Sequence, residues 1–246
     1  MKQPSSVAVL TGAARNIGRA TALKLASLGF HIVLHTGSDQ ANLSKTIAMV
    51  RKVGVSCEGV VGALGNPSTI ATLYDTAQSI GPCQILINNA SVRKTCGFLD
   101  MTLEEWREVF SINCEAQFLC TQRFLPDMLE KGWGRVVCLG GLSAHTGALQ
   151  RAAVVASKSA VPGLIRALAV EFAETNITFN CIVPGHITVE RTAETGARLK
   201  HPNFEGKNVP YGQPDDIASM ISMLVGENSG FINGQTIHIN GGAFLP

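Results

Sequence analysis

The sequence predicts a single α/β domain with a doubly wound parallel sheet of about seven strands and helices on both faces. Short apolar runs alternate with longer periodic stretches along most of the 246 residues, which is typical of repeated strand and helix units. The composition, 46% hydrophobic and 15% charged, is sufficient to bury one large core. A glycine-containing turn joins the first apolar run to the first periodic stretch. We therefore expect one domain over residues 1–246.

Seven apolar runs are the candidate strands. The helix between the first two has an apolar face that starts at Ile17 and passes through Leu25, and Gly29 is expected to end it. This arrangement predicts a strand, helix, strand unit at the start of the chain. The strands are expected at Val7–Leu10, His31–Leu34, Ser56–Val61, Gln84–Ile87, Arg135–Leu139, Ile177–Ile182 and Thr236–Ile239.

Two later helices are also indicated. Thr102 and Glu105 have the spacing of a capping box and predict a helix that runs to Pro126 or beyond. Residues 152–172 carry apolar side chains around nearly the whole helix, and such a helix is expected to be buried on all sides. In a chain of this size that pattern predicts a subunit interface as well as a core.

Composition and charge narrow the classes of function. The 20 basic and 18 acidic residues leave a formal charge of +2 without a dense basic run, so neither nucleic acid nor an anionic membrane is an expected partner. No apolar run approaches the ~20 residues of a membrane span, and the first residues lack a signal-peptide core. The seven cysteines include no Cys-x-x-Cys pair, which predicts reduced thiols, a cytoplasmic location and no metal site. A small-molecule substrate is expected.

The turn from Thr11 to Gly18 carries the first chemical signal. Gly12 permits a tight turn, and Gly18 permits close approach of the helix to the strand. The unpaired N–H groups of the following helix can then bind a pyrophosphate. The turn thus predicts a dinucleotide site, and a purely structural turn is the alternative.

Five motifs in register resemble the short-chain dehydrogenase/reductase family. They are Thr11-Gly12 to Gly18, Asn88-Asn89-Ala90, Asn113, Lys158 and Pro184-Gly185-His186-Ile187. The resemblance runs from about residue 7 to Gly242 and implies a Rossmann fold, a nicotinamide cofactor and oxidoreductase activity. It also implies a homo-oligomer, a tetramer or a dimer.

The resemblance further implies which residues bind the cofactor. Asn89 and Ala90 would lie against the adenosine, Ala63 and Leu64 near the adenine, and Ile187 beside the nicotinamide. Asn16 and Ala63 depart from the family, which usually has glycine and aspartate there; asparagine tolerates a positive φ, so the turn can survive. The cofactor set is Gly12, Arg15, Asn16, Ile17, Gly18, His35, Thr36, Ser38, Ala63, Leu64, Asn89, Ala90, Lys158, Pro184, Gly185 and Ile187.

The end of the second strand favours NADP(H) over NAD(H). An acid there would bind a ribose 2′-hydroxyl and repel a 2′-phosphate. The chain reads His35-Thr36-Gly37-Ser38, with no acid before Asp39, and Arg15 adds a cation. The alternative is that Arg15 is a solvated loop residue beside a neutral turn.

The catalytic set is where the chain departs most from the family, which uses Asn, Ser, Tyr and Lys. Asn113 and Lys158 remain, but Val154 stands where Tyr is expected and Gly141 where Ser is expected. Without the Tyr hydroxyl the family's proton donor is missing. The register leaves no substitute among Tyr74 and Tyr211, and Ser143 replaces the serine only if its loop is shifted.

Other side chains in the expected pocket are candidate replacements. His186 is favoured as the proton donor because the Pro-Gly turn places it near the nicotinamide and histidine titrates near neutrality. The predicted catalytic residues are therefore Asn113, Lys158 and His186, and residues 186–210 are predicted to form a loop that covers the substrate. Each replacement has a plain solvated loop residue as its alternative; the others considered are Arg93, Lys94, His145 and Arg151.

Two functions follow from this pattern. The first is an NADP(H)-dependent oxidoreductase that reduces a conjugated C=C, a C=N or iminium, or an activated carbonyl, because hydride transfer itself is the chemistry of the cofactor. The second is a catalytically inactive NADP(H)-binding subunit or sensor that pairs with an active homologue.

Overall fold

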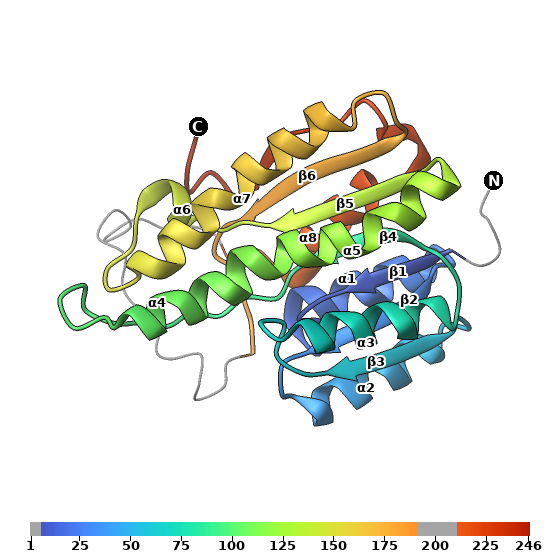
Figure 1. Cartoon of the computed structure of the whole chain (residues 1–246), viewed down its shortest axis with the longest axis horizontal. Coiled ribbons are helices and arrows are strands. Elements are labelled where there is room, and N and C mark those ends of the chain that lie inside the picture. Colours follow the sequence, from blue (N-terminus) through green and yellow to red (C-terminus); the bar gives the residue numbers. More distant parts are fainter. Residues whose placement is uncertain (1–5, 191–210) are drawn as a thin grey trace.

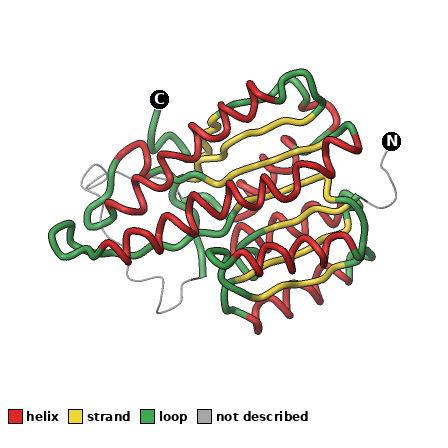
Figure 2. Tube along the Cα trace, in the orientation of Figure 1, coloured by secondary structure: helices red, strands yellow, loops and turns green. Residues whose placement is uncertain are grey.

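A computed structural model describes residues 6–190 and 211–246. Its centre is a parallel sheet in the order β3-β2-β1-β4-β5-β6-β7, flanked by helices (Figures 1 and 2). The predicted doubly wound α/β fold is therefore confirmed. The strands are β1 Val7–Leu10, β2 His31–Thr36, β3 Cys57–Val61, β4 Cys83–Asn88, β5 Gly134–Leu139, β6 Ile177–Pro184 and β7 Thr236–Ile239.

The helices lie in two layers (Figure 1). Helix α8 packs on α1, while α5 packs on β4 and on α3, and α7 packs on β6. The described helices are α1 Asn16–Ser27, α2 Gln40–Arg51, α3 Pro67–Gln78, α4 Leu103–Phe110, α5 Ala116–Lys131, α6 Ser143–Thr146, α7 Ala152–Glu171 and α8 Pro214–Leu224.

Strand β1 shows how the sequence supplies both cores. Successive side chains of a strand point to opposite faces of the sheet. Val7 and Val9 join one apolar cluster, which includes Phe124 of α5, whereas Ala8 and Leu10 join the other, with side chains of α1 and α8. An unbroken apolar strand is therefore required, because both faces of the sheet are covered.

The long helix after Thr102 has a break that the sequence did not predict. The capping box is present, with the Thr102 side chain and Glu105 each bonding the other's backbone N–H. However, a π-helical turn at Ser111–Glu115 separates α4 from α5, and Asn113 lies in it. Such turns are frequent at functional sites.

Helix α7 is less buried in the single chain than its composition predicts. It is the one described helix that is long and apolar enough to cross a membrane by length and composition, and 39% of that stretch is buried. Val161 and Ile165 are fully buried in the core, but Val170 is 78% exposed. The sheet covers one face of the helix, and burial of the other face in a subunit interface stays a prediction.

Candidate active site

The loops that follow β1 and β4 interlock at the carboxyl edge of the sheet. The Thr11 hydroxyl accepts hydrogen bonds from the backbone N–H groups of Asn89 and Ala90, both at 3.0 Å. The Asn89 amide donates to the Gly12 carbonyl at 2.7 Å. Gly12 has φ +63°, and a Cβ there would lie 2.7 Å from the Ala90 Cα. Only glycine meets both demands, so the tight turn expected at Gly12 is present.

The start of α1 is built to receive an anion. A Cβ on Gly18 would lie 2.5 Å from the Ala13 Cα, so the helix comes unusually close to the loop. No side chain caps the helix, and its first turn holds no acidic residue. Its first N–H groups therefore have no side-chain cap, and the region carries positive potential. These residues fit the pyrophosphate of a dinucleotide.

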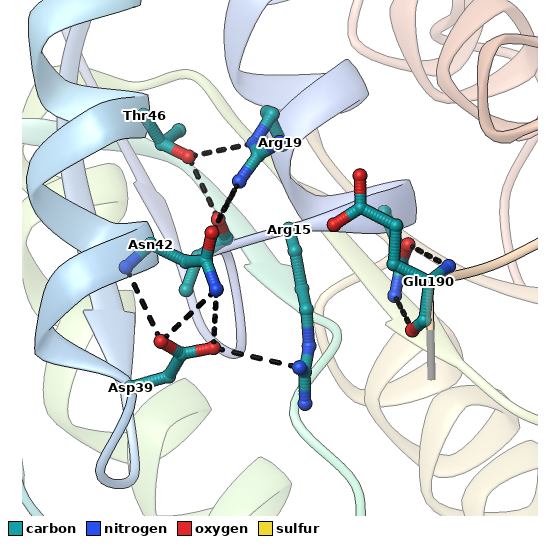
Figure 3. A network of polar contacts seen from close by, with 8 residues as sticks. Arg15, Arg19, Asp39, Asn42, Thr46 and Glu190 are labelled. Atoms are coloured by element: carbon teal, nitrogen blue, oxygen red, sulfur yellow. Dashed lines mark hydrogen bonds and ion pairs between the residues drawn. The ribbon is translucent and has the colours of Figure 1, made fainter. Parts of the chain in front are cut away.

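Asn16, where the resemblance implies a glycine, connects this turn to the loop after β6. Its φ is +52°, as the tolerance of asparagine for the left-handed region predicts. Its side chain accepts a bond from the Glu190 N–H at 2.8 Å and donates to the Glu190 carbonyl at 3.1 Å (Figure 3). Both hydrogen bonds need the side-chain amide of Asn16, which a glycine would lack.

In the predicted ribose site, the Arg15 guanidinium forms an ion pair with the carboxylate of Asp39, which follows β2. Arg15 lies 3.5 Å from the Asp39 carboxylate, and both side chains are about a quarter exposed (Figure 3). Asp39 also accepts from the backbone N–H of Asn42 and caps α2. The Asn42 side chain, and then the charges of Arg15 and Arg19, hold the pKa of Asp39 below its usual range. Asp39 therefore stays charged beside Arg15.

His35 and Leu64 lie beneath the predicted cofactor surface. His35 is 2% exposed; its Nδ1 accepts from the Gly12 N–H at 3.4 Å and its Nε2 lies 2.7 Å from the Gly62 carbonyl. Burial lowers the pKa of His35, so the ring is neutral and braces the glycine turn. Leu64 is 3% exposed, whereas Ala63 is exposed. Direct cofactor contact by His35 and Leu64 stays a prediction.

Both the oxygen and the nitrogen of the Asn113 side-chain amide form hydrogen bonds to neighbouring segments. It is fully buried, accepts from the Val92 N–H at 2.8 Å and donates to the Val92 carbonyl at 3.1 Å and to the Ser157 hydroxyl at 3.2 Å. These bonds tie the segment after β4 to α7. Asn113 is therefore a positioning residue in this structure.

Lys158 is a buried basic residue that lines the site. It is 5% exposed, and its ammonium donates to the Leu139 carbonyl at 2.6 Å. Burial, and then the nearby charge of Arg93, lower its pKa to about 8. A lysine in this state can change protonation near neutral pH.

A cavity of about 160 Å³ opens above Lys158. Val154 and Gly141 both line it, and a Cβ on Gly141 would have 4.0 Å to the Lys158 side chain and to the Ser143 hydroxyl. The two positions at which the resemblance leads us to expect Ser and Tyr, 141 and 154, therefore face the same cavity. The remaining wall includes Ser91, Val92, Arg93, Gly140, Leu142, Ser143, Thr146, Ala148, Leu149, Arg151, Pro184, Gly185 and His186.

Two of the sequence candidates lie away from this cavity wall. Lys94 forms an ion pair with Glu108, and the His145 ring packs on His238 at 4.5 Å between centroids. Arg93, Arg151, Ser143 and His186 line the cavity together. Ser143 thus lines the cavity, although it stands two residues past the position at which the serine is expected.

The two tyrosines have different positions. Tyr74 donates to Asp127 at 2.9 Å, across the α3 and α5 helices, as expected. Tyr211 lies closer to the site than the sequence indicated, with its ring 5.7 Å from that of His186. A bridge between Ile187 and Gly212 brings them together, and no local pattern signals this pairing. Of the predicted covering segment 186–210, residues 191–210 lie outside the described residues.

Comparisons with known proteins agree on the family. Residues 12–243 match the family model described as enoyl-(acyl carrier protein) reductase. The chain is 31% identical over 248 residues to the 3-oxoacyl-[acyl-carrier-protein] reductase FabG of Aquifex aeolicus, covering 99% of both chains. It is 31% identical to a short-chain type dehydrogenase/reductase of Picea abies, covering 96% of this chain and 91% of that one. Acetoin dehydrogenase YohF from Salmonella typhimurium superposes with a TM-score of 0.86 at 29% identity, over 97% of this chain and 95% of its own.

Proposed function

Because the chain belongs to the short-chain dehydrogenase/reductase family of oxidoreductases, we propose that it is an NADP(H)-dependent enzyme that reduces its acceptor without a tyrosine proton donor. The observation that carries this proposal is the cavity itself. Its wall keeps Lys158, while Val154 and Gly141 occupy the positions where the family's Tyr and Ser are expected. The nucleotide cradle next to it has the closely packed turn that a dinucleotide needs.

The chain's own residues divide the work as follows. Gly12, Asn89 and the start of α1 would hold the nucleotide, and Lys158 would bind the nicotinamide ribose. When bound, the nicotinamide supplies the hydride. Asn113 orients the wall of the cavity, and Ile187 bounds the nicotinamide side.

The missing hydroxyls decide the class of acceptor. One lost oxyanion donor costs about 10²–10³ in rate, and general acid catalysis contributes ~10²–10⁴. Reduction of an unactivated ketone is therefore expected to be very slow. A conjugated C=C, a C=N or an activated carbonyl needs less help, and His186 in the cavity wall is the proposed proton donor.

NADP(H) is the proposed cofactor because β2 ends in Thr36-Gly37-Ser38 and Arg15 stands beside it. The charge of Asp39 opposes this preference in part, since its carboxylate lies 3.5 Å from Arg15. A bound 2′-phosphate would compete with that carboxylate for the guanidinium.

The test is NADPH consumption with ketones, enones and imines, including acetoin and a 3-oxoacyl thioester. His186→Gln should lower kcat and alter its pH profile with little change in KM. His145→Gln is the matched control, because that ring packs on His238 outside the described cavity wall. If NADPH binds in a calorimeter and no acceptor class is reduced, the oxidoreductase proposal is wrong.

That failure would leave the second candidate, an inactive NADP(H)-binding subunit that assembles with an active homologue. The exposed apolar positions of α7 and α5 favour assembly, with Val170 at 78% and Phe118 at 45% exposure. For the enzyme we propose a homo-oligomer, a dimer or tetramer, built on these helices. Light scattering of the purified protein, together with its turnover, separates the two candidates.

A further inference from the structure

The side-chain amide of Asn16 connects the nucleotide turn to the segment that follows β6. Asn16 is the first residue of α1, and Glu190 lies beyond the end of β6. The amide oxygen accepts a hydrogen bond from the Glu190 N–H at 2.8 Å, and the amide nitrogen donates to the Glu190 carbonyl at 3.1 Å (Figure 3). We propose that Asn16 is a positioning residue, which couples nucleotide binding at the start of α1 to the placement of this segment at Glu190. The inference rests on the proposed function and specifies how two parts of its site act together.

The contact involves only backbone atoms of Glu190. An asparagine amide offers an acceptor and a donor side by side, and here the two pair with the N–H and the carbonyl of a single residue. Two bonds to one residue fix its orientation as well as its position. The contact therefore depends on the side chain at position 16 and is independent of the side chain at position 190.

The backbone conformation of Asn16 limits which residues can make this contact. Its φ of +52° lies in the left-handed region, which glycine, asparagine and aspartate adopt most readily. An aspartate carboxylate has no donor for the Glu190 carbonyl, and glycine has no side chain. Asparagine thus meets both demands. Asn16→Gly is the variant that removes both bonds while the turn stays free of backbone strain.

The same segment is held nearer to β6 by Gly212. The Gly212 N–H donates to the His186 carbonyl at 2.9 Å, and the Gly212 carbonyl accepts from the Thr188 N–H at 2.8 Å. A Cβ on Gly212 would lie 2.9 Å from the Ile187 side chain, so the two stretches of chain are in close contact. His186, which lines the cavity, therefore lies on a short segment with two points of attachment. Gly212 fixes the end that includes His186, and Asn16 fixes the later end.

A nucleotide at the start of α1 should strengthen the contact between Asn16 and Glu190. The N–H groups there are the proposed ligands of the pyrophosphate, so binding restricts the backbone of the residue whose side chain holds Glu190. Part of the conformational entropy that the contact costs is then already lost. Coupling between two equilibria is reciprocal. The factor by which NADPH stabilises the contact therefore equals the factor by which the contact raises NADPH affinity.

Amide hydrogen exchange, measured by NMR, tests this coupling without turnover. NADPH should slow exchange of the Glu190 N–H about five- to tenfold, which is an ordinary coupling for two hydrogen bonds. Asn16→Gly should abolish this effect and should weaken NADPH binding in calorimetry by the same factor. The Thr188 N–H is the internal reference. It should change far less in the variant, because it donates to Gly212 and makes no bond to Asn16.

Glu190→Ala is the matched control, because it keeps the backbone groups that Asn16 binds. Exchange at residue 190 should still slow when NADPH binds to this variant. The Arg19 N–H, which donates to the Arg15 carbonyl at the start of α1, should be unaffected in Asn16→Gly. Unchanged exchange at Glu190 or unchanged NADPH affinity in Asn16→Gly overturns the inference. Faster exchange at Arg19 also overturns it, because the turn itself has then loosened. If the coupling is present and no acceptor class is reduced, the oxidoreductase proposal is wrong and the role of Asn16 stands.

Discussion

Around the ends of β1 and β4, the site is held by backbone geometry, whereas beyond β5 it depends on individual side chains. The first region, the nucleotide cradle, is fixed by the close approach of Gly12 to Ala90 and by the bonds of Thr11 and Asn89. In the second region, the cavity, Gly141 and Val154 line the wall together with the side chain of Lys158. The contrast teaches that an added Cβ collides with the backbone in the cradle at Gly12, whereas the cavity has room for one at Gly141.

The largest effect is expected from an added methyl group in the cradle. Gly12→Ala places a Cβ 2.7 Å from the Ala90 Cα at a φ of +63°, so the turn must open. NADPH affinity should fall at least about a hundredfold, since the cradle loses its close approach. Gly141→Ala is the control, because its Cβ has 4.0 Å of space. Equal NADPH affinities in calorimetry would refute the contrast.

Restoring the hydroxyl groups should change the cavity without touching the cradle. The double variant Val154→Tyr with Gly141→Ser should raise ketone reduction by about 10² or more, because it returns a general acid and an oxyanion donor. Reduction of the native acceptor should not need either change. Initial rates with both substrates decide the matter, and a native reaction that depends on the double variant would contradict the proposal.

The protonation of Lys158 should show in the pH dependence of NADPH binding, because its ammonium is proposed to bind the nicotinamide ribose. Its pKa is lowered to about 8, so the ammonium is present below that pH and is lost above it. NADPH affinity should therefore fall above pH 8, by up to about tenfold per unit while the free amine dominates. Lys158→Met should bind more weakly and lose this dependence. A wild-type affinity that stays constant up to pH 10 would exclude a role for this ammonium.

The smallest effect concerns the choice of nucleotide. Arg15→Met should lower the preference for NADPH over NADH about tenfold, because one charged contact to the 2′-phosphate is lost. Asp39→Asn should raise the preference, since a repulsive carboxylate is removed. Lys24→Met, on the exposed side of α1, is the control. Dissociation constants for both nucleotides test the three variants, and an unchanged ratio in Arg15→Met would favour a solvated role for that arginine.

Much of the fold was predictable because its signals are local. The short apolar runs located all seven strands of the described sheet. Gly29 and the Thr102 capping box marked helix boundaries within a residue or two. The π-helical turn at Ser111–Glu115 was not predictable, because its residues are compatible with a regular helix. Its cause is tertiary, as Asn113 in that turn bonds across to Val92 and Ser157.

Parts of the site were also beyond sequence reasoning. The pairing of Arg15 with Asp39 depends on how α2 lies against the glycine turn, and spacing along the chain does not give that. Tyr211 was set aside on its position in the sequence, yet its ring lies 5.7 Å from His186. The burial of His35, which is 2% exposed, was not indicated by its position at the end of an apolar run.

The sequence by itself determined where the strands lie along the chain, which residues form the glycine turn, and that Gly and Val stand at 141 and 154, because each is a matter of residue type at a fixed spacing. Only the tertiary structure decided that Gly141 and Val154 share one cavity with Arg93, Arg151 and His186. The physical reason is that parallel strands bring the loops at their carboxyl ends to one edge of the sheet. Residues more than ninety positions apart, such as Arg93 and His186, then line the same cavity.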